Sequence, residues 1–361
     1  MYLKSIRLKN FRNIEYVELD DISKGITVFM GENAQGKTNL IEAVNYLSCA
    51  RSFRNVSDDA LIKNGEERAE ISCRFTGSYS GKVEAALLKN GGRTIKVNSL
   101  PVKRVGDMIG RVNTVVFAPE DIRAIKDRPA VRRRLIDEEI SKIKPSYYIL
   151  LQKYMSVLKN KNKLLKENAD ASLIDIFNLQ LSEYGAQIVE KRREFLTSVS
   201  DIAKKNQTDI TGKDEFLTIE YKSCVQGEDI AGEMSEKLNS MLKKEQLFKT
   251  SLYGPHREDI DLKINGESLR LSASQGQQRT AMISFKLACA EVGINELMDE
   301  PVLLLDDVFS ELDKSRRERL INKVKKFQVF ITVTDAVASQ DFKNVDLYRV
   351  SGGHFKICKK Q

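Results

Sequence analysis

The stretch that decides the fold class is Gly31-Glu32-Asn33-Ala34-Gln35-Gly36-Lys37-Thr38, which fits the pattern G-x-x-x-x-G-K-[ST] without a mismatch. Its glycines let the backbone curl so that successive N–H groups point at a phosphate chain. Lys37 is the cation expected to bridge β- and γ-phosphate oxygens, and the Thr38 hydroxyl is a Mg²⁺ ligand. An apolar run at 25–30 precedes the loop, and helical spacing of apolar residues follows from Leu40. This strand–loop–helix order predicts a nucleoside triphosphate site in an α/β domain rather than a chance surface loop.

A second stretch, residues 302–307, is an apolar strand that ends in Asp306 and Asp307. A strand end beside a phosphate loop is where a magnesium-holding aspartate is expected. We therefore predict that Asp306 holds Mg²⁺, directly or through water, and that Asp307 orients or polarises the attacking water. Alone, an Asp-Asp strand end is equally compatible with a turn or a helix cap.

Two short polar segments have less specific signals. Residues 271–279 form a small polar loop that leads into a helix with apolar periodicity, and Ser274 and Gly276 offer a hydroxyl and an amide at its start. These are the parts of a second anion site, although an ordinary helix start uses the same residues. The stretch from Ser310 to Asp313 is also compatible with the cap of a helix predicted at 315–326.

The composition of the 361-residue, 41.0-kDa chain bounds its class. With 41% hydrophobic and 30% charged residues it is typical of a soluble globular protein of about two domains. The net charge of +8 permits a polyanionic partner without demonstrating one. No apolar run approaches the ~20 residues of a membrane-spanning helix, so we expect a cytoplasmic protein with no membrane partner. Five cysteines without a C-x-x-C pair, and two histidines, argue against a zinc or histidine-based metal site.

Hydrophobic periodicity predicts the domain organisation. Alternation predicts strands over 69–75 and a hairpin over 83–97, and short apolar runs predict buried strands at 112–117, 302–305 and 329–333. Helix breakers are scarce between Pro145 and Pro255, which predicts helices there. We expect a discontinuous α/β domain at 1–127 and 241–361, interrupted by a mostly helical lobe at 128–240.

Four lysines in that lobe form either a solvated helix face or a DNA contact. We predict the solvated face for Lys159, Lys161, Lys163 and Lys166.

The order of these motifs resembles the ABC-type ATPase heads of the SMC class, and in finer detail the bacterial RecF family. The resemblance covers essentially the whole chain, and the phosphate loop and the last two stretches are its most specific parts. It rests on Leu8-Lys9-Asn10-Phe11-Arg12-Asn13, residues 31–39, Phe117-Ala118-Pro119-Glu120-Asp121, Arg132-Arg133-Arg134 with Asp137, Gly254-Pro255-His256-Arg257, residues 274–279 and residues 304–313.

The resemblance implies ATP and Mg²⁺ as cofactors and a homodimer that forms around ATP. Each phosphate loop would face the partner's S-Q-G loop, so Ser274, Gln275, Gly276 and Gln277 would contact the nucleotide in trans. Ser310 and Asp313 would lie across the same seam. Near the nucleotide of their own subunit it implies Arg12 and Asn13, together with Glu120 in the loop that senses the γ-phosphate.

The chain departs from that pattern at two positions. Many ABC heads have glutamate where this chain has Asp307, one methylene shorter, which predicts slow hydrolysis. Those heads often carry a switch histidine after the last strand, where residues 331–335 read Ile-Thr-Val-Thr-Asp, so a threonine or Asp335 would replace it. The lobe is also too short for the long coiled coil of SMC proteins.

The resemblance further implies a role in recombinational DNA repair, replication-fork recovery and SOS induction. RecF-like proteins bind gapped DNA at junctions of single and double strand, and with RecO and RecR they help to load RecA. We expect a weak, DNA-stimulated ATPase that acts as a switch. Basic residues between 123 and 134 are candidate phosphate contacts, although they are equally able to pair with Glu138 and Glu139. The candidates are Arg128, Arg132, Arg133 and Arg134.

Two other classes share the phosphate loop. The ATPase subunit of a membrane transporter would use the same ATP chemistry, but the helical insertion and the basic stretch argue against it. A small-molecule P-loop kinase would have no use for Ser274-Gln275-Gly276.

Overall fold

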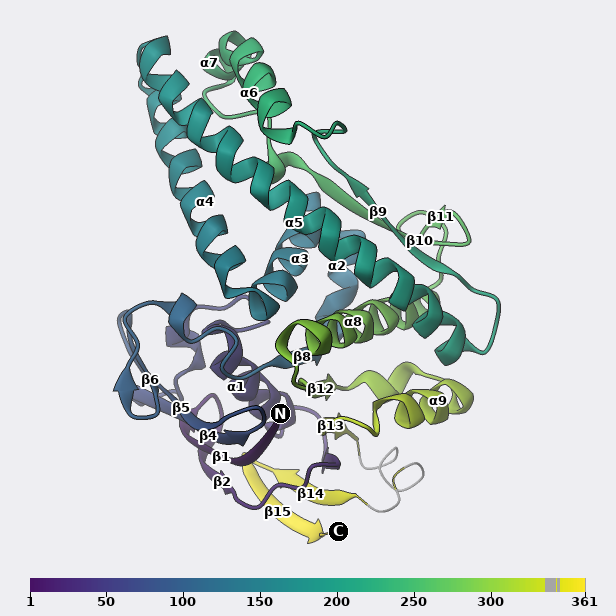
Figure 1. Ribbon diagram of the computed structural model, residues 1–361. Coiled ribbons are helices and arrows are strands. Elements are labelled where there is room, and N and C mark those ends of the chain that lie inside the picture. Colours follow the sequence, from purple (N-terminus) through teal and green to yellow (C-terminus); the bar gives the residue numbers. More distant parts are fainter. Residues whose placement is uncertain (335–341, 343–344, 361) are drawn as a thin grey trace. The chain divides into compact units, whose positions relative to one another are not determined.

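The computed structural model describes residues 1–334, 342 and 345–360. The chain divides into two compact units. The first comprises Met1–Ile122, Ile202–Glu215 and Ser274–Gln361, and the second comprises Arg123–Asp201 and Phe216–Ala273 (Figure 1).

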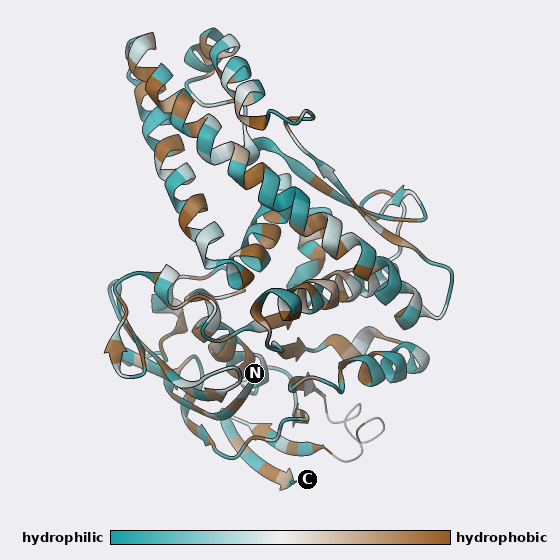
Figure 2. Ribbon diagram, viewed as in Figure 1, coloured by the Kyte–Doolittle hydropathy of each residue, from teal (hydrophilic) through white to brown (hydrophobic). Residues whose placement is uncertain are grey.

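A six-stranded, mostly parallel sheet forms the centre of the first unit, in the order β15-β14-β3-β13-β12-β8. Its strands are β3 (Ile26–Met30), β8 (Thr114–Phe117), β12 (Val302–Asp306), β13 (Val329–Val333), β14 (Asp346–Ser351) and β15 (His354–Lys359). Only β15 runs antiparallel to its neighbour. Every residue of β8, β12 and β13 is buried, and the apolar residues of these strands are brown in Figure 2. The predicted buried strands are confirmed.

A second, antiparallel sheet has the order β2-β1-β4-β5-β6-β7. It contains β1 (Tyr2–Phe11), β2 (Ile14–Leu19), β4 (Arg68–Thr76), β5 (Ser80–Leu88), β6 (Gly92–Val97) and β7 (Leu100–Pro101). The predicted hairpin over 83–97 is confirmed as β5 and β6. Helix α1 (Lys37–Cys49) contributes Leu40, Val44 and Leu47 to one core with both sheets.

A separate core covers the other face of the parallel sheet. Helix α8 (Gln275–Leu297) contributes Ile283 and Leu287, and helix α9 (Lys314–Val324) contributes Leu320 and Val324. Both helices therefore fix the loops at their N-termini against the same sheet that carries the phosphate loop.

The second unit contains helices and a small sheet. Its elements are α2 (Ile122–Lys126), α3 (Pro129–Ile143), α4 (Pro145–Lys166), most of α5 (Ala171–Thr211), β9 (Leu217–Lys222), α6 (Ile230–Ser240), α7 (Leu242–Phe248), β10 (Asp259–Ile264) and β11 (Glu267–Ser268). Single turns of 3₁₀-helix occupy Asp58–Leu61, Val105–Asp107, Pro119–Asp121, Pro255–Arg257 and Val308–Glu311. None of the helices in the described ranges has the length and apolarity to cross a bilayer.

The units differ from the boundaries expected from the sequence. Residues 202–215, expected in the helical lobe, belong to the first unit, because the end of α5 is bonded to α8 and α9. Ser284 Oγ donates to Gln207 Oε1 at 2.8 Å, and Arg319 donates to the Thr211 carbonyl at 2.7 Å. Residues 241–273, expected in the ATPase domain, belong to the second unit, where β10 pairs with β9 along its whole length.

The predicted lysine face is wrong at Lys161. This side chain is fully buried and forms a 2.6 Å ion pair with Glu245, which is also fully buried. Burial lowers the pKa of Lys161, and the hydrogen bond and charge of Glu245 oppose that shift. Lys159, Lys163 and Lys166 are exposed, as expected.

The second unit also encloses most of His256, which is only partly exposed. Its Nδ1 shares a 2.7 Å hydrogen bond with the Tyr154 hydroxyl, and burial lowers the pKa of His256 to about 3. The folded state therefore keeps this histidine neutral at pH values where an unfolded chain, with a histidine pKa of about 6.5, binds a proton.

This difference predicts a pH dependence of stability. Because the unfolded state binds the extra proton below about pH 6.5, the His256 contribution is complete above that pH and falls as the pH drops toward 3. Between pH 7 and pH 5 the free energy of unfolding should fall by about 2 kcal/mol through His256 alone. Urea unfolding of the wild type and of His256→Asn at both pH values measures this, and an identical pH dependence in the two proteins would refute it.

Candidate nucleotide site

The phosphate loop lies between β3 and α1 and is shaped by two glycines. A Cβ on Gly31 would lie 2.3 Å from the Val350 carbonyl oxygen, so only glycine fits there. Gly36 has a φ of 113°, a conformation that favours glycine. Lys37 Nζ donates to the carbonyl oxygens of Gly31 at 2.7 Å and Glu32 at 2.6 Å. The ammonium group therefore lies over the inside of the loop, where a phosphate chain would be cradled.

Two turns support this loop from outside the motif. Asn13, in the turn between β1 and β2, donates from Nδ2 to the Ala34 carbonyl at 3.4 Å and accepts from Asn39 at 2.8 Å. Gly352 and Gly353, in the turn between β14 and β15, donate their N–H groups to Gln35 Oε1 at 2.6 Å and the Gln35 carbonyl at 2.9 Å. Sequence reasoning missed this second turn, although Ser-Gly-Gly-His is a turn signal.

Asp306 lies at the end of β12, directly beside the phosphate loop. Its Oδ1 accepts hydrogen bonds from the Thr38 hydroxyl at 2.8 Å and from the Thr332 hydroxyl at 2.6 Å. Burial raises the pKa of Asp306, and the two hydroxyls and the charge of Arg54 oppose that rise. A buried carboxylate of this kind is stabilised by a nearby cation. The two predicted Mg²⁺ ligands are thus in contact.

Asp307 turns out of the strand. Its φ of 49° is in the left-handed region, and its N–H donates to Thr332 Oγ1 at 3.0 Å. The Thr332 hydroxyl is therefore hydrogen-bonded to both aspartates, because Thr332 lies opposite Asp306 where β13 pairs with β12. Among the residues proposed to replace a switch histidine, Thr332 is in the site, and Asp335 lies outside the described residues.

Glu120 supplies a third carboxylate. Its Oε1 lies 3.9 Å from Arg54 Nε, whereas its Oε2 is buried without a hydrogen-bond partner in the described part of the chain. Its charge contributes to the raised pKa of Asp306. The Asp306 carboxylate and the Thr38 hydroxyl, which are in contact, are oxygen donors that fit a hard cation such as Mg²⁺.

Sequence reasoning missed Arg54 and Glu42. Arg54 donates to Asn39 Oδ1 at 3.3 Å and lies 3.9 Å from Glu42, which is fully buried on α1. Glu42 also accepts a hydrogen bond from Ser52. Neither residue is in a recognisable motif, and their roles follow from the packing of 51–54 against α1. Glu42 thereby helps to hold the Arg54 guanidinium at the edge of the phosphate site.

Arg12 is placed differently from its neighbour Asn13. Its guanidinium forms a double hydrogen bond with Glu42, at 2.9 Å on each side, and donates to the Ala60 carbonyl at 2.8 Å. Arg12 therefore contacts the site through Glu42, whereas Asn13 contacts the loop itself.

The residues predicted to act in trans lie on loops at the starts of α8 and α9. Ser274 caps α8 and accepts from the Gln277 N–H at 3.3 Å, and Ser274 and Gln275 are exposed. Asp313 caps α9 and accepts from the Arg316 N–H at 2.9 Å, which with Ser315 lowers its pKa. Ser310 is exposed and donates to the Asp307 carbonyl at 2.9 Å.

A further geometric relation joins the two loops. A Cβ on Gly276 would lie 3.6 Å from the Arg316 guanidinium, so the start of α9 borders the start of α8. Exposed hydroxyl and amide groups of both loops are thus available to another molecule.

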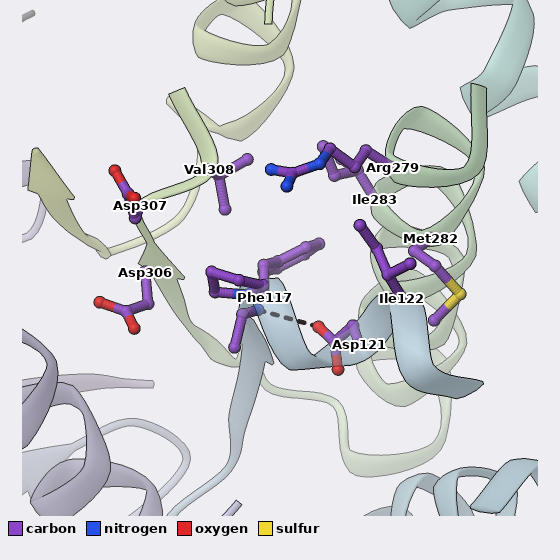
Figure 3. Close-up of a pocket in the computed structure, with 11 residues that line it drawn as sticks. Phe117, Asp121, Ile122, Arg279, Met282, Ile283, Asp306, Asp307 and Val308 are labelled. Carbon is purple, nitrogen blue, oxygen red and sulfur yellow. Dashed lines mark hydrogen bonds between the residues drawn. The ribbon is translucent and has the colours of Figure 1, made fainter. Parts of the chain in front are cut away.

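A pocket adjoins the aspartate pair within the first unit (Figure 3). Figure 3 shows Arg279 of α8 extending toward Val308, and Asp307 and Asp306 pointing in different directions. Asp121 accepts a hydrogen bond from the Ala118 N–H at 2.9 Å, which fixes the turn that carries Glu120. The pocket lies where α8, the Glu120 turn and the end of β12 meet.

Most of the predicted DNA contacts are engaged within the protein. Arg132 is 4% exposed and its guanidinium binds both Asp259 oxygens at 2.7 and 2.9 Å. Arg133 donates to the Glu258 carbonyl, and Arg134 pairs with Glu138 at 2.8 Å. Arg132 is therefore a structural residue, and the predicted alternative of pairing with Glu138 is confirmed for Arg134. Arg128 remains exposed.

Comparison with known proteins identifies the family. The model for the RecF/RecN/SMC N-terminal domain matches residues 2–355. The chain is 36% identical over 358 residues to the DNA replication and repair protein RecF of Clostridium novyi, covering 98% of this chain and 99% of that protein. The chain belongs to the RecF family. A RecF protein of a Thermoanaerobacter species is 38% identical over 363 residues.

Solved structures agree with this membership. The recombination mediator protein RecF with ATP, in the RecFOR pathway, superposes with a TM-score of 0.91 at 36% identity, and 99% of each chain is covered. The Smc head domain of Pyrococcus furiosus shares the fold, with a TM-score of 0.59 at 16% identity. The expected SMC- and RecF-like ATPase-head fold is confirmed, and RecF membership decides against the transporter-subunit and kinase alternatives.

Proposed function

We propose that this chain is an ATP-switched, DNA-binding protein of recombinational DNA repair. The observation that carries the proposal is the contact between Thr38 of the phosphate loop and Asp306 of β12, two predicted site residues that are 268 positions apart in the sequence. A RecF protein that shares 36% identity over nearly the whole chain was solved with ATP.

The nucleotide would be held by the loop amides and by Lys37, whose ammonium group would exchange the Gly31 and Glu32 carbonyls for phosphate oxygens. Thr38 and Asp306 would hold Mg²⁺, with Glu120 close by. When bound, Mg²⁺ neutralises charge that develops on the phosphate oxygens. Asp307 would orient the attacking water, and its short side chain supports the expectation of slow hydrolysis.

The dimer would form by closing two half-sites. Ser274, Gln275, Gly276 and Gln277 of one subunit would meet the nucleotide on the other, with Ser310 and Asp313 across the same seam. Exposure of Ser274 and Gln275, and their position at the N-terminus of α8, where a helix favours an anion, support this arrangement. ATP would favour the closed state by binding it more tightly than the open one.

The biological role is proposed from relatives. They are named DNA replication and repair proteins, and one is described in the RecFOR pathway. We infer that the chain binds gapped DNA at junctions of single and double strand, acts with RecO and RecR, and assists loading of RecA in the cytoplasm.

Ser274→Arg should separate nucleotide binding from dimerisation. Because Ser274 lies at the start of α8 and not in the phosphate loop, the affinity of the variant for ATP should stay within about twofold of the wild-type value. The long arginine side chain at the dimer interface should weaken ATP-dependent dimerisation by about 10-fold or more, which corresponds to at least about 1.4 kcal/mol. Fluorescent-nucleotide binding and sedimentation measure the two quantities. A variant that dimerises like the wild type in ATP would contradict the shared site.

A further inference from the structure

A stretch of the antiparallel sheet carries an unusual charge pattern. The 16 residues from Lys89 to Arg104 include five cations and no acid. They form β6 and β7 at the edge of the first unit's antiparallel sheet, a part of the molecule that the nucleotide site does not use.

The hairpin at the end of this stretch has a fixed shape. Val97 pairs with Leu100, and Asn98 and Ser99 between them have φ values of 51° and 66°, the left-handed conformation of a tight two-residue turn. Asn98 exchanges hydrogen bonds with Lys82 of β5: its Oδ1 accepts from the Lys82 N–H at 2.8 Å, and its own N–H donates to the Lys82 carbonyl at 2.9 Å. The turn therefore projects from a supported base.

The five cations fall into two groups. Lys89 pairs with Glu67 at 3.2 Å and Arg93 pairs with Asp58 at 3.3 Å, so both are engaged at the base. Lys96, Lys103 and Arg104 are exposed, and no ion pair to them is found among the described residues. We call residues 96–104 the hairpin tip.

Acids near the hairpin tip do not neutralise it. Glu84 lies opposite Lys96 in the register, but its carboxylate pairs with Lys82 at 2.6 Å. Asp107 is exposed, three residues beyond Arg104. Leu100, which follows the turn, has 71% of its surface exposed and lies between Lys96 and Lys103 in the sequence.

We propose that the hairpin tip contacts DNA. Lys96, Lys103 and Arg104 would neutralise backbone phosphates, and Leu100 would pack against a base pair exposed at the end of a duplex. Apolar side chains of other DNA-binding proteins likewise pack against unstacked bases, where they insert between base steps. The inference rests on the proposed function as a DNA-binding protein. Arg132, Arg133 and Arg134 were the sequence-based candidates for phosphate contacts, but they are engaged by partners within the second unit. The hairpin tip would provide such contacts instead.

The phosphate contacts predict a specific salt dependence. The triple variant Lys96→Ala, Lys103→Ala, Arg104→Ala should bind a gapped duplex with ATP about 10- to 100-fold more weakly, and the slope of log affinity against log salt should fall by about 2 to 3. Fluorescence anisotropy over a salt series measures both. The matched control is Lys159→Ala, Lys163→Ala, Lys166→Ala on α4, which removes the same charge from another exposed lysine surface and should bind like the wild type.

The apolar contact has its own signature. Leu100→Ser should weaken binding to gapped DNA several-fold and leave binding to a covalently closed duplex without ends unchanged. The salt slope should also stay unchanged, because no phosphate contact is lost. Wild-type affinity and slope in the hairpin triple variant, or the loss appearing in the α4 triple variant instead, would overturn the inference.

Two further measurements keep the outcomes distinct. Thermal unfolding shows whether the triple variant folds, and its ATP-dependent sedimentation should match the wild type, since none of these residues lies in the nucleotide site. If the wild type itself fails to bind DNA, the proposed function fails; if only the hairpin triple variant is without effect, the proposed function stands and the hairpin tip is not the contact.

Discussion

Asp306→Asn should lower the rate of ATP hydrolysis by on the order of 10²–10³-fold. The carboxylate is the negative group in contact with Thr38, and asparagine keeps its size and one oxygen but removes the charge that would hold Mg²⁺. Phosphate release at saturating ATP and Mg²⁺ measures the loss.

Asp307→Asn is the matched control at the next position. Because Asp307 is predicted to orient water and not to hold the metal, this variant should hydrolyse ATP more slowly than the wild type. Its Mg²⁺-dependent affinity for ATP should stay close to that of the wild type. If Asp306→Asn hydrolysed ATP at the wild-type rate, the assignment of Asp306 to the metal would be wrong.

Lys161→Met should destabilise the protein by about 3–5 kcal/mol. The substitution leaves the Glu245 carboxylate fully buried without the ammonium that now lies 2.6 Å away. Glu245 would keep only the hydrogen bonds from Ser251 Oγ at 2.9 Å and the Leu252 N–H at 2.8 Å. Urea unfolding followed by circular dichroism measures the change.

Two companion variants isolate the buried pair. Lys163→Met, on an exposed position of the same helix, should change stability by no more than about 0.5 kcal/mol. The double variant Lys161→Met, Glu245→Gln should recover part of the loss, because glutamine carries no charge and can still accept both hydrogen bonds. A cost below about 1 kcal/mol for Lys161→Met alone would show that the pair contributes little.

The sequence was most informative where the determinants are contiguous. The phosphate loop specifies its own turn through Gly31, Gly36 and Lys37, and the apolar run of β12 places Asp306 at a strand end. These short-range patterns predicted the strand–loop–helix element, the parallel strands and the proximity of Asp306 to the loop, because parallel strands present their carboxyl ends at one edge.

Features that depend on distant pairing were not predictable in this way. Gly352 and Gly353 support Gln35 from more than 300 residues away, and Arg54 is placed by the packing of its segment against Glu42. The helical spacing of Lys161 does not distinguish it from its exposed neighbours, since only the position of Glu245 on α7 decides that it is buried.

Two copies of this chain are proposed to join around ATP, each phosphate loop facing the partner's Ser274 loop. Sedimentation velocity of the wild type at micromolar concentration tests it most directly, without nucleotide, with ADP and with ATP and Mg²⁺. We expect a species of 41.0 kDa in the first two conditions and one of twice that mass with ATP. A 41.0-kDa species that persists while ATP binding is saturated would show that ATP does not join the two copies.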